Sequence, residues 1–95
     1  MISQEVVIKN KKYEYINMRL GKKAPLVILK GSTGYIMCAY LNMEAANSLG
    51  DIAVKVTGVN DVNDILNSEV NSCSGGAQEL GIKPGNRIMD IIDRL

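Results

Sequence analysis

Hydrophobic and polar residues alternate along the first part of the chain, which is the pattern of β-strands. Residues 5–9 (EVVIK) and 12–20 (KYEYINMRL) are predicted strands, and Asn10 and Lys11 are the tight turn expected between them. In the second strand the isoleucine, methionine and leucine share one face, and both tyrosines lie on the other. Such alternation is typical of an antiparallel strand with one face toward water.

The middle of the chain is apolar without alternation. Residues 26–29 (LVIL) and 35–41 (YIMCAYL) flank a Gly-Ser-Thr-Gly turn at 31–34. Because neither run has a polar face, both strands are expected to be covered on both sides. Helices would cover one side, and a helix or another subunit would cover the other. This hairpin is therefore predicted to be the centre of the fold.

The second half of the chain contains the helical patterns. Helices are predicted over 43–49, 62–68, 74–80 and 85–95, with a strand over 52–59 between the first two. Asn42 and Asp61 stand where an N-cap side chain is needed, and Gly50 stands where the first helix should end. The last segment has apolar residues at i, i+3, i+4 and i+7, which is one face of an amphipathic helix.

Strands thus cluster before helices, which is the element order of an α+β domain. We expect a small mixed or antiparallel sheet of about five strands, with helices packed mainly on one face. At 95 residues the chain is expected to form a single domain spanning residues 1–95.

Composition adds expectations about partners. The chain is 46% hydrophobic, and a domain this small buries only part of such surface, so a homo-oligomer is expected. Eleven basic and ten acidic residues give a net charge of +1, which lacks the basic footprint of nucleic-acid binding. We expect no signal peptide, no membrane span, no membrane partner and a cytoplasmic location with free thiols.

Histidine is absent from the chain, which excludes Ser-His and Cys-His catalytic pairs and His-ligated metals. The two cysteines, Cys38 and Cys73, form no CxxC pair, which argues against a zinc site or a thioredoxin-like motif. We expect no metal site. The sequence identifies no cofactor, so the cofactor is unknown, and it leaves open whether the chain is an enzyme.

The turn at 31–34 has two interpretations. Its successive amides, with the hydroxyls of Ser32 and Thr33, would make a nest for an anion. An ordinary hairpin turn, in which glycine supplies the positive φ, accounts for the same residues, and the spacing is not that of a P-loop. Nearby, Asp51 is either a polar residue after a helix end or a carboxylate beside Lys30 or Lys55 at the sheet edge.

Cys38 also has two interpretations. Inside an apolar strand, a free cysteine usually behaves as a small buried hydrophobe. As a nucleophile it would need a pKa lowered by a cation or by the helix start at Asn42, together with some exposure to solvent. Cys73 lies in a polar stretch (NSCSGG) and is expected to be the more exposed of the two thiols.

Four segments in order resemble one family: KGSTGYIMCAYLN (30–42), LGDIAVKVTGV (49–59), NDVNDILNSEV (60–70) and AQELGIKPG (77–85). They are similar to the YunC-like family of small bacterial and archaeal proteins, a domain of unknown function. The resemblance covers residues 26–95, and it implies a compact α/β fold without an established activity. It departs at Ala39, where the family tends to have glycine. It points to Lys30, Gly31, Gly34, Cys38, Asn42, Gly50, Asp51 and Gly58.

Three functions remain open from the sequence. The first is binding of a small ligand near the turn at 31–34 and the helix start at Asn42. The second is a thiol-dependent enzyme that uses Cys38 with a backbone oxyanion hole. The third is a purely structural interaction module. The candidate ligand-binding residues are Lys30, Gly31, Ser32, Gly34, Cys38, Asn42 and Asp51.

Overall fold

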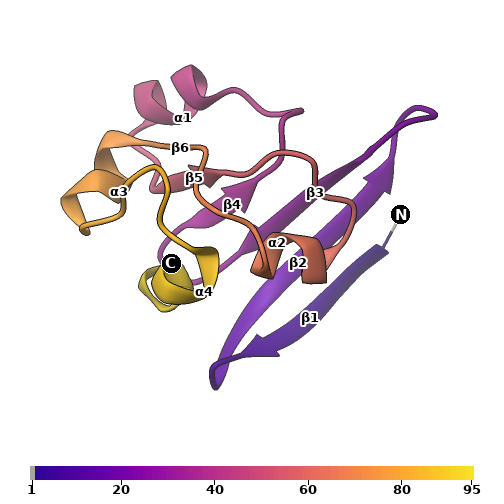
Figure 1. Cartoon of the computed structure of the whole chain (residues 1–95), viewed down its shortest axis with the longest axis horizontal. Coiled ribbons are helices and arrows are strands. Elements are labelled where there is room, and N and C mark those ends of the chain that lie inside the picture. The colour runs from indigo at the N-terminus through magenta and orange to yellow at the C-terminus, as the bar shows by residue number, and fades with distance from the viewer. Residues whose placement is uncertain (1) are drawn as a thin grey trace.

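The computed structural model describes residues 2–95, which form a six-stranded sheet with the strands in sequence order (Figure 1). The strands are β1 Ile2–Ile8, β2 Lys11–Arg19, β3 Pro25–Lys30, β4 Tyr35–Met37, β5 Ala53–Lys55 and β6 Ser72–Cys73. The helices are α1 Met43–Leu49, α2 Val62–Leu66, α3 Gly75–Glu79, α4 Ile88–Ile91 and the 3-10 turn η1 Ile92–Arg94. The predicted α+β class is confirmed.

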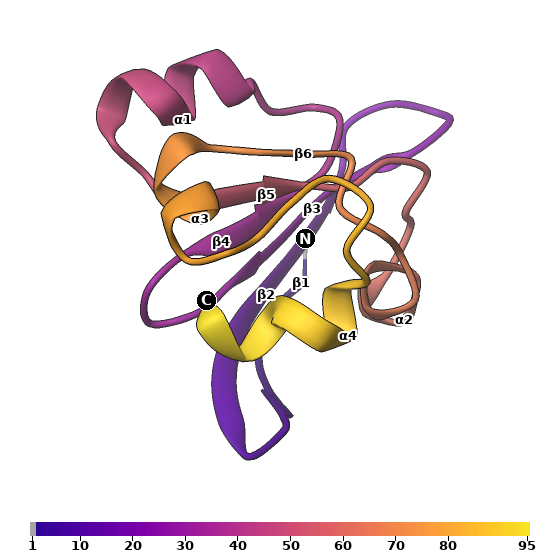
Figure 2. The same cartoon turned by 60° about the vertical axis from the view of Figure 1, so that its left-hand side comes forward.

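The sheet is mixed, and its helices are unequally shared between its faces. Neighbouring strands are antiparallel except β4 and β5, which are parallel because α1 carries the chain back between them. The main core joins the sheet to α2, α3, α4 and η1 on one face. On the other face α1 covers only β4 and β5, through a small cluster of Met37, Ala46 and Ala53 (Figure 2).

The first hairpin turns one residue earlier than predicted. Lys9 and Asn10 are its turn residues, with φ of 52° and 65°, and Ile8 pairs with Lys11. Two positive φ values are those of a type I′ turn, which suits the twist of an antiparallel pair. The sequence prediction placed Asn10 first in the turn, whereas the fold places it second.

The buried face of β2 is the tyrosine face. Tyr13 and Tyr15 are 3% and 4% exposed, while Ile16 and Met18 are half-buried on the opposite face. Burial is possible because the hydroxyls have partners. Tyr13 donates to the Ile92 carbonyl at 2.8 Å, and Tyr15 accepts from Asn17 Nδ2 at 2.8 Å. The polarity of the side chains alone would therefore predict that the wrong face of β2 is buried.

The expectation that both central strands are covered on both sides is right only for β4. Ile36 lies in the main core and Met37 packs against α1. In β3, every second residue is only half-buried, because α1 does not extend over this strand. The half-buried residues Ile16, Met18, Leu26 and Ile28 form what we call the open sheet face.

Several predicted boundaries change in the fold. The strand expected over 35–41 ends at Met37, and the strand expected over 52–59 is limited to Ala53–Lys55. The last helix begins at Ile88 and not at residue 85, because Gly85 has a φ of 91°, outside the helical region. Strand β6 was not predicted, since two residues carry no periodicity.

Amide hydrogen exchange should be slowest in residues 26–29 and in residues 36–37. These backbone groups lie inside the sheet, with β2 on one side and β5 on the other. Exchange monitored by two-dimensional NMR would test this, with the edge strand β1 as the internal comparison. Greater protection in β1 than in β3 would contradict the central position of this hairpin.

Candidate functional site

The turn at 31–34, which we call the glycine turn, is hydrogen-bonded to the backbone of Leu95. Its own closing bond runs from the Gly31 amide to the Gly34 carbonyl at 2.8 Å. The amides of Thr33 and Gly34 both donate to the Leu95 oxygen, at 2.6 and 2.8 Å. Two amides of the predicted anion nest are thus already used within the chain, so the turn does not offer a free nest to a ligand.

Gly31 is required by this contact. A Cβ at residue 31 would lie 2.5 Å from the Leu95 oxygen and 2.6 Å from its carbonyl carbon, both of which are main-chain atoms. No side chain fits at that distance. Because Gly31 has no side chain, the backbone of Leu95 can approach it this closely.

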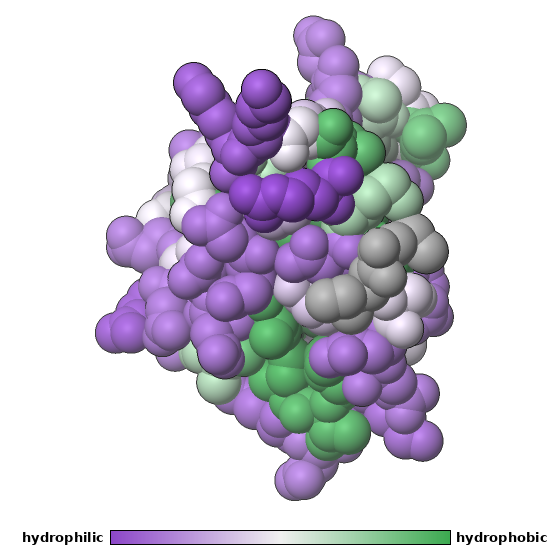
Figure 3. Space-filling view, turned by 90° about the vertical axis from the view of Figure 1, so that its right-hand side faces the viewer, coloured by the Kyte–Doolittle hydropathy of each residue, from purple (hydrophilic) through white to green (hydrophobic). Residues whose placement is uncertain are grey.

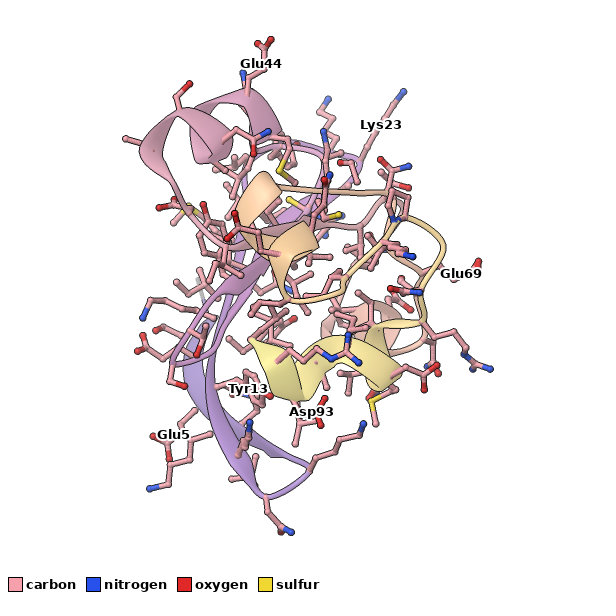
Figure 4. All side chains as sticks on the ribbon, turned by 90° about the vertical axis from the view of Figure 1, so that its left-hand side faces the viewer. Glu5, Tyr13, Lys23, Glu44, Glu69 and Asp93 are labelled. Carbon is pink, nitrogen blue, oxygen red and sulfur yellow. The ribbon has the colours of Figure 1, made fainter. Side chains whose placement is uncertain are left out.

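The first hairpin holds the last helix in the position that brings Leu95 to the turn. Tyr13 donates to the Ile92 carbonyl, and the ammonium groups of Lys9 and Lys11 donate to the carbonyls of Met89 and Asp93. Figure 4 shows Tyr13 and Asp93 close together beside this helix. Burial, and secondarily the negative charge of Asp93, raise the pKa of Tyr13, so its hydroxyl keeps the proton it donates.

On its other side the glycine turn presses against the start of β5. A Cβ on Gly34 would lie 2.5 Å from the Ile52 carbonyl oxygen. The same oxygen accepts from the Tyr35 amide at 3.0 Å. The hydroxyl of Ser74, which is fully buried, donates to the Asp51 carbonyl at 2.7 Å and accepts from the Ala53 amide at 2.9 Å. These bonds fix the backbone that carries the Asp51 side chain.

A hollow of about 320 Å³ lies between the glycine turn and the start of β5, and we call it the turn hollow. Five of the seven residues predicted for a ligand site line it, namely Lys30, Gly31, Ser32, Gly34 and Asp51. Thr33, Tyr35, Gly50 and Ile52 complete the lining. The hollow therefore contains one ammonium, one carboxylate and three hydroxyl groups.

Asp51 is held by a tyrosine and not by a lysine. The Tyr35 hydroxyl donates to Asp51 Oδ2 at 2.7 Å. Burial, then the hydrogen bond and the charge of Asp51, raise the pKa of Tyr35 to about 12, so this group is a neutral donor. Tyr35 is not among the residues predicted for the site, although a tyrosine in an apolar strand needs a partner for its hydroxyl.

Lys30 and Asp51 both lack ion-pair partners in the part of the chain that the structure describes. Within residues 2–95 the ion pair found is Lys12 with Glu5, at 3.8 Å between exposed side chains. Lys30 and Asp51 therefore form no ion pair with each other or with a neighbouring side chain of the described residues, although Glu14 lies opposite Lys30 in the register of β2 and β3.

Cys38 does not reach the turn hollow. It is 4% exposed in the main core, and its sulfur accepts from the Val27 amide at 3.4 Å. The structure does not bring Cys38 together with the other residues predicted for a ligand site, and it places this cysteine in the main core. Cys73, expected to be exposed, is 7% exposed, and burial raises its pKa.

Asn42 also lies away from the turn hollow. Its side chain caps α1, accepting from the Glu44 and Ala45 amides at 2.7 and 3.3 Å, as predicted for an N-cap. Because α1 runs antiparallel to the strands it connects, its start lies at the far end of β4 from the glycine turn. The glycine turn instead meets the end of α1, where Gly50 has a φ of 76°.

Two further hollows border the same turn, and Ser32 lines both. One, of about 460 Å³, also contacts residues 10–13 and Leu95. The other, of about 220 Å³, contains Glu5, Lys12, Glu14 and Lys30, whose charges alternate in sign. Among the described residues no cluster of three or more His, Cys, Asp or Glu side chains suits a metal ion. None of the helices over residues 2–95 is long and apolar enough to cross a membrane.

Comparison with known proteins gives one family and one close structural relative. The family model DUF1805, a domain of unknown function, matches residues 37–95. The crystal structure of a protein of unknown function, TA1206 from Thermoplasma acidophilum, is similar with a TM-score of 0.95 and 45% identity. The match covers 99% of this chain and 91% of that chain. No curated protein matches the chain.

Replacing Tyr35 by phenylalanine should lower the free energy of unfolding at pH 7 by about 2 kcal/mol, because the Asp51 carboxylate loses its donor. The folded-state pKa of Tyr35 is about 12, above the 10.0 that is usual for tyrosine, so its stabilisation is complete below pH 10. It is lost as the pH rises toward 12. Urea unfolding at pH 7 and pH 11 would therefore show a smaller difference between parent and variant at pH 11.

The matched control for this prediction is Tyr40→Phe. The Tyr40 ring is 50% exposed, and its hydroxyl donates to the Ala24 carbonyl at 3.2 Å, with no carboxylate involved. This control should change stability little at either pH. An equal deficit of Tyr35→Phe at both pH values would contradict the proposed linkage.

Proposed function

The chain belongs to the DUF1805 family, a domain of unknown function, and from its geometry we propose that it binds a small ligand in the turn hollow and works as a homo-oligomer. The observation that carries the ligand proposal is the pair of opposite charges, Lys30 and Asp51, on one hollow without ion-pair partners in residues 2–95. Small-molecule sites typically combine a concave surface with a few placed polar groups.

The ligand class follows from the chemistry of the lining. Lys30 would bind an anionic group, with the hydroxyls of Ser32 and Thr33 as further donors. Asp51 keeps one oxygen on the Tyr35 hydroxyl, which leaves its other oxygen to accept from an ammonium group. A small zwitterion, of the kind represented by a free amino acid, satisfies both charges.

The size of the hollow favours the same class. About 320 Å³ lies at the lower end of the volumes typical of ligand pockets, which run from about 300 to 1,000 Å³. A nucleotide or a larger cofactor would project from it into solvent.

The alternative of a thiol-dependent enzyme has little support. Cys38 is 4% exposed and lines none of the three hollows. Within the chain no histidine is present to take its proton. A purely structural interaction module is the alternative that remains if the turn hollow binds nothing.

Apolar surface supports the homo-oligomer. Val7 is 64% exposed and Leu20 55% exposed, and the open sheet face carries four half-buried apolar side chains that no helix covers. A second copy of the chain would remove such surface from water. Both cysteines are free, which supports a reducing compartment such as the cytoplasm.

Titration of the ¹⁵N-labelled protein with the standard amino acids, followed by two-dimensional NMR, tests the ligand proposal. At least one amino acid should shift the amides of residues 31–34 and 50–52. Its analogues lacking either the amino or the carboxylate group should bind at least about tenfold more weakly, because one charged hydrogen bond is lost. Asp51→Asn should weaken binding by a similar factor and keep the Tyr35 contact.

Glu44→Gln is the control, since it removes a carboxylate that points away from the molecule at the start of α1 (Figure 4). Binding by this variant should equal that of the parent. Shifts that persist unchanged in Asp51→Asn, or no shift with any amino acid, would refute the ligand proposal.

A further inference from the structure

We infer that the outer edge of β1 is the surface through which two copies of this chain pair, antiparallel, so that their sheets join into one. This inference rests on the proposed homo-oligomer and names its interface. The strand order places β1 at one end of the sheet, and no segment of residues 2–95 pairs with its outer side.

The register shows which backbone groups face outward. Ile8 and Lys11 flank the two-residue turn and therefore form a hydrogen-bonded pair. Pairs alternate along an antiparallel ladder, so the even-numbered residues of β1 bond to β2. Ser3, Glu5 and Val7 then direct their N–H and C=O groups away from the sheet. A strand placed alongside would find three donors and three acceptors in a line.

This edge lacks most of the features that usually keep sheet edges from pairing. Such features are prolines, bulges, very short strands, edge or inward charges and a covering loop, and of these β1 carries one edge charge, Glu5. β1 has seven residues, an unbroken register with β2 and no proline. The opposite edge strand, β6, has only two residues. Of the two edge strands, β1 is therefore the one that can pair with a strand of another chain.

The side chains suit a second copy of the same strand. With the twofold axis at Val6, this residue meets Val6 of the second copy, and Glu5 meets Val7 of the copy. Like charges are then not opposed. Val6 already packs on the main core, so the pairing extends that core across the interface. Figure 3, which faces this side of the molecule, shows apolar side chains gathered in its lower half.

Val7 contributes on the other face of the strand. It is 64% exposed, more than any residue of the open sheet face, each of which is already half-buried by its neighbours. Pairing at β1 therefore covers the most exposed apolar side chain among residues 3–95 that lie in the sheet. It also satisfies directional backbone groups, which packing on the open sheet face would not do.

Sedimentation equilibrium of the parent and of Glu5→Pro tests the inference. The parent should have twice the 10.3 kDa chain mass at micromolar concentration. Proline removes an N–H that points outward and leaves the ladder with β2 intact, a position where edge strands accept it. The dimer dissociation constant should rise at least about 100-fold, because the partner strand loses hydrogen bonds and meets the ring.

Three further variants make the outcome specific. Glu5→Ala keeps the N–H and should stay dimeric, as should Met18→Asp, which places a charge on the open sheet face. Val7→Glu places a carboxylate opposite Glu5 of the second copy and should dissociate the dimer even if Glu5→Pro fails to fold.

A dimer that withstands both Glu5→Pro and Val7→Glu overturns the inference. If Met18→Asp alone dissociates the dimer, the homo-oligomer stands and its interface is the open sheet face. A parent chain that is monomeric at 100-fold higher concentration than these measurements refutes the oligomer itself, and leaves the ligand proposal for the turn hollow unaffected.

Discussion

The close approach of three chain segments at the glycine turn is the constraint on which the rest of the structure depends. Leu95 presents its oxygen to the Thr33 and Gly34 amides, and Gly31 has no side chain to prevent it. From the other side the Ile52 carbonyl reaches Gly34 just as closely. The last helix, the centre of the sheet and the start of β5 therefore meet at four residues, and each holds the others in register.

This junction also explains why the proposed ligand site is made of side chains and not of backbone amides. Three of the four amides of the turn, those of Gly31, Thr33 and Gly34, are already bonded within the chain, which leaves no complete anion nest for a ligand. What remains for a ligand is the rim, where Lys30 and Asp51 face a hollow without ion-pair partners in the described residues. The Tyr35 hydroxyl and the bond of the buried Ser74 hydroxyl to the Asp51 backbone position the Asp51 carboxylate.

Local chemistry made part of the fold and of the site predictable. Side chains that satisfy neighbouring amides, such as Asn42 at α1 and Asp61 at α2, act within a few residues and follow from the sequence. The turn and Asp51 come together because a parallel strand-helix-strand unit returns the chain to its starting edge. The same geometry places Asn42 at the end of β4 that lies away from the glycine turn. The local sequence pattern does not show this.

What the sequence did not predict depends on distant partners. Tyr13 is buried because the Ile92 carbonyl accepts a hydrogen bond from its hydroxyl, and Cys73 is buried because β5 and Ile82 surround a strand of two residues. Side-chain polarity pointed the other way in both cases. Tyr35 belongs to the proposed site because its hydroxyl donates to Asp51, sixteen residues further along the chain.

The free energy of unfolding of Gly34→Ala, compared with Gly75→Ala, measures the central constraint most directly. A Cβ at residue 34 would meet the Ile52 carbonyl oxygen at 2.5 Å, whereas one at residue 75 would have its nearest neighbour at 3.9 Å. We predict a loss of about 2 to 4 kcal/mol for Gly34→Ala and a change within about 0.5 kcal/mol for Gly75→Ala. Equal stability of the two variants would contradict the account.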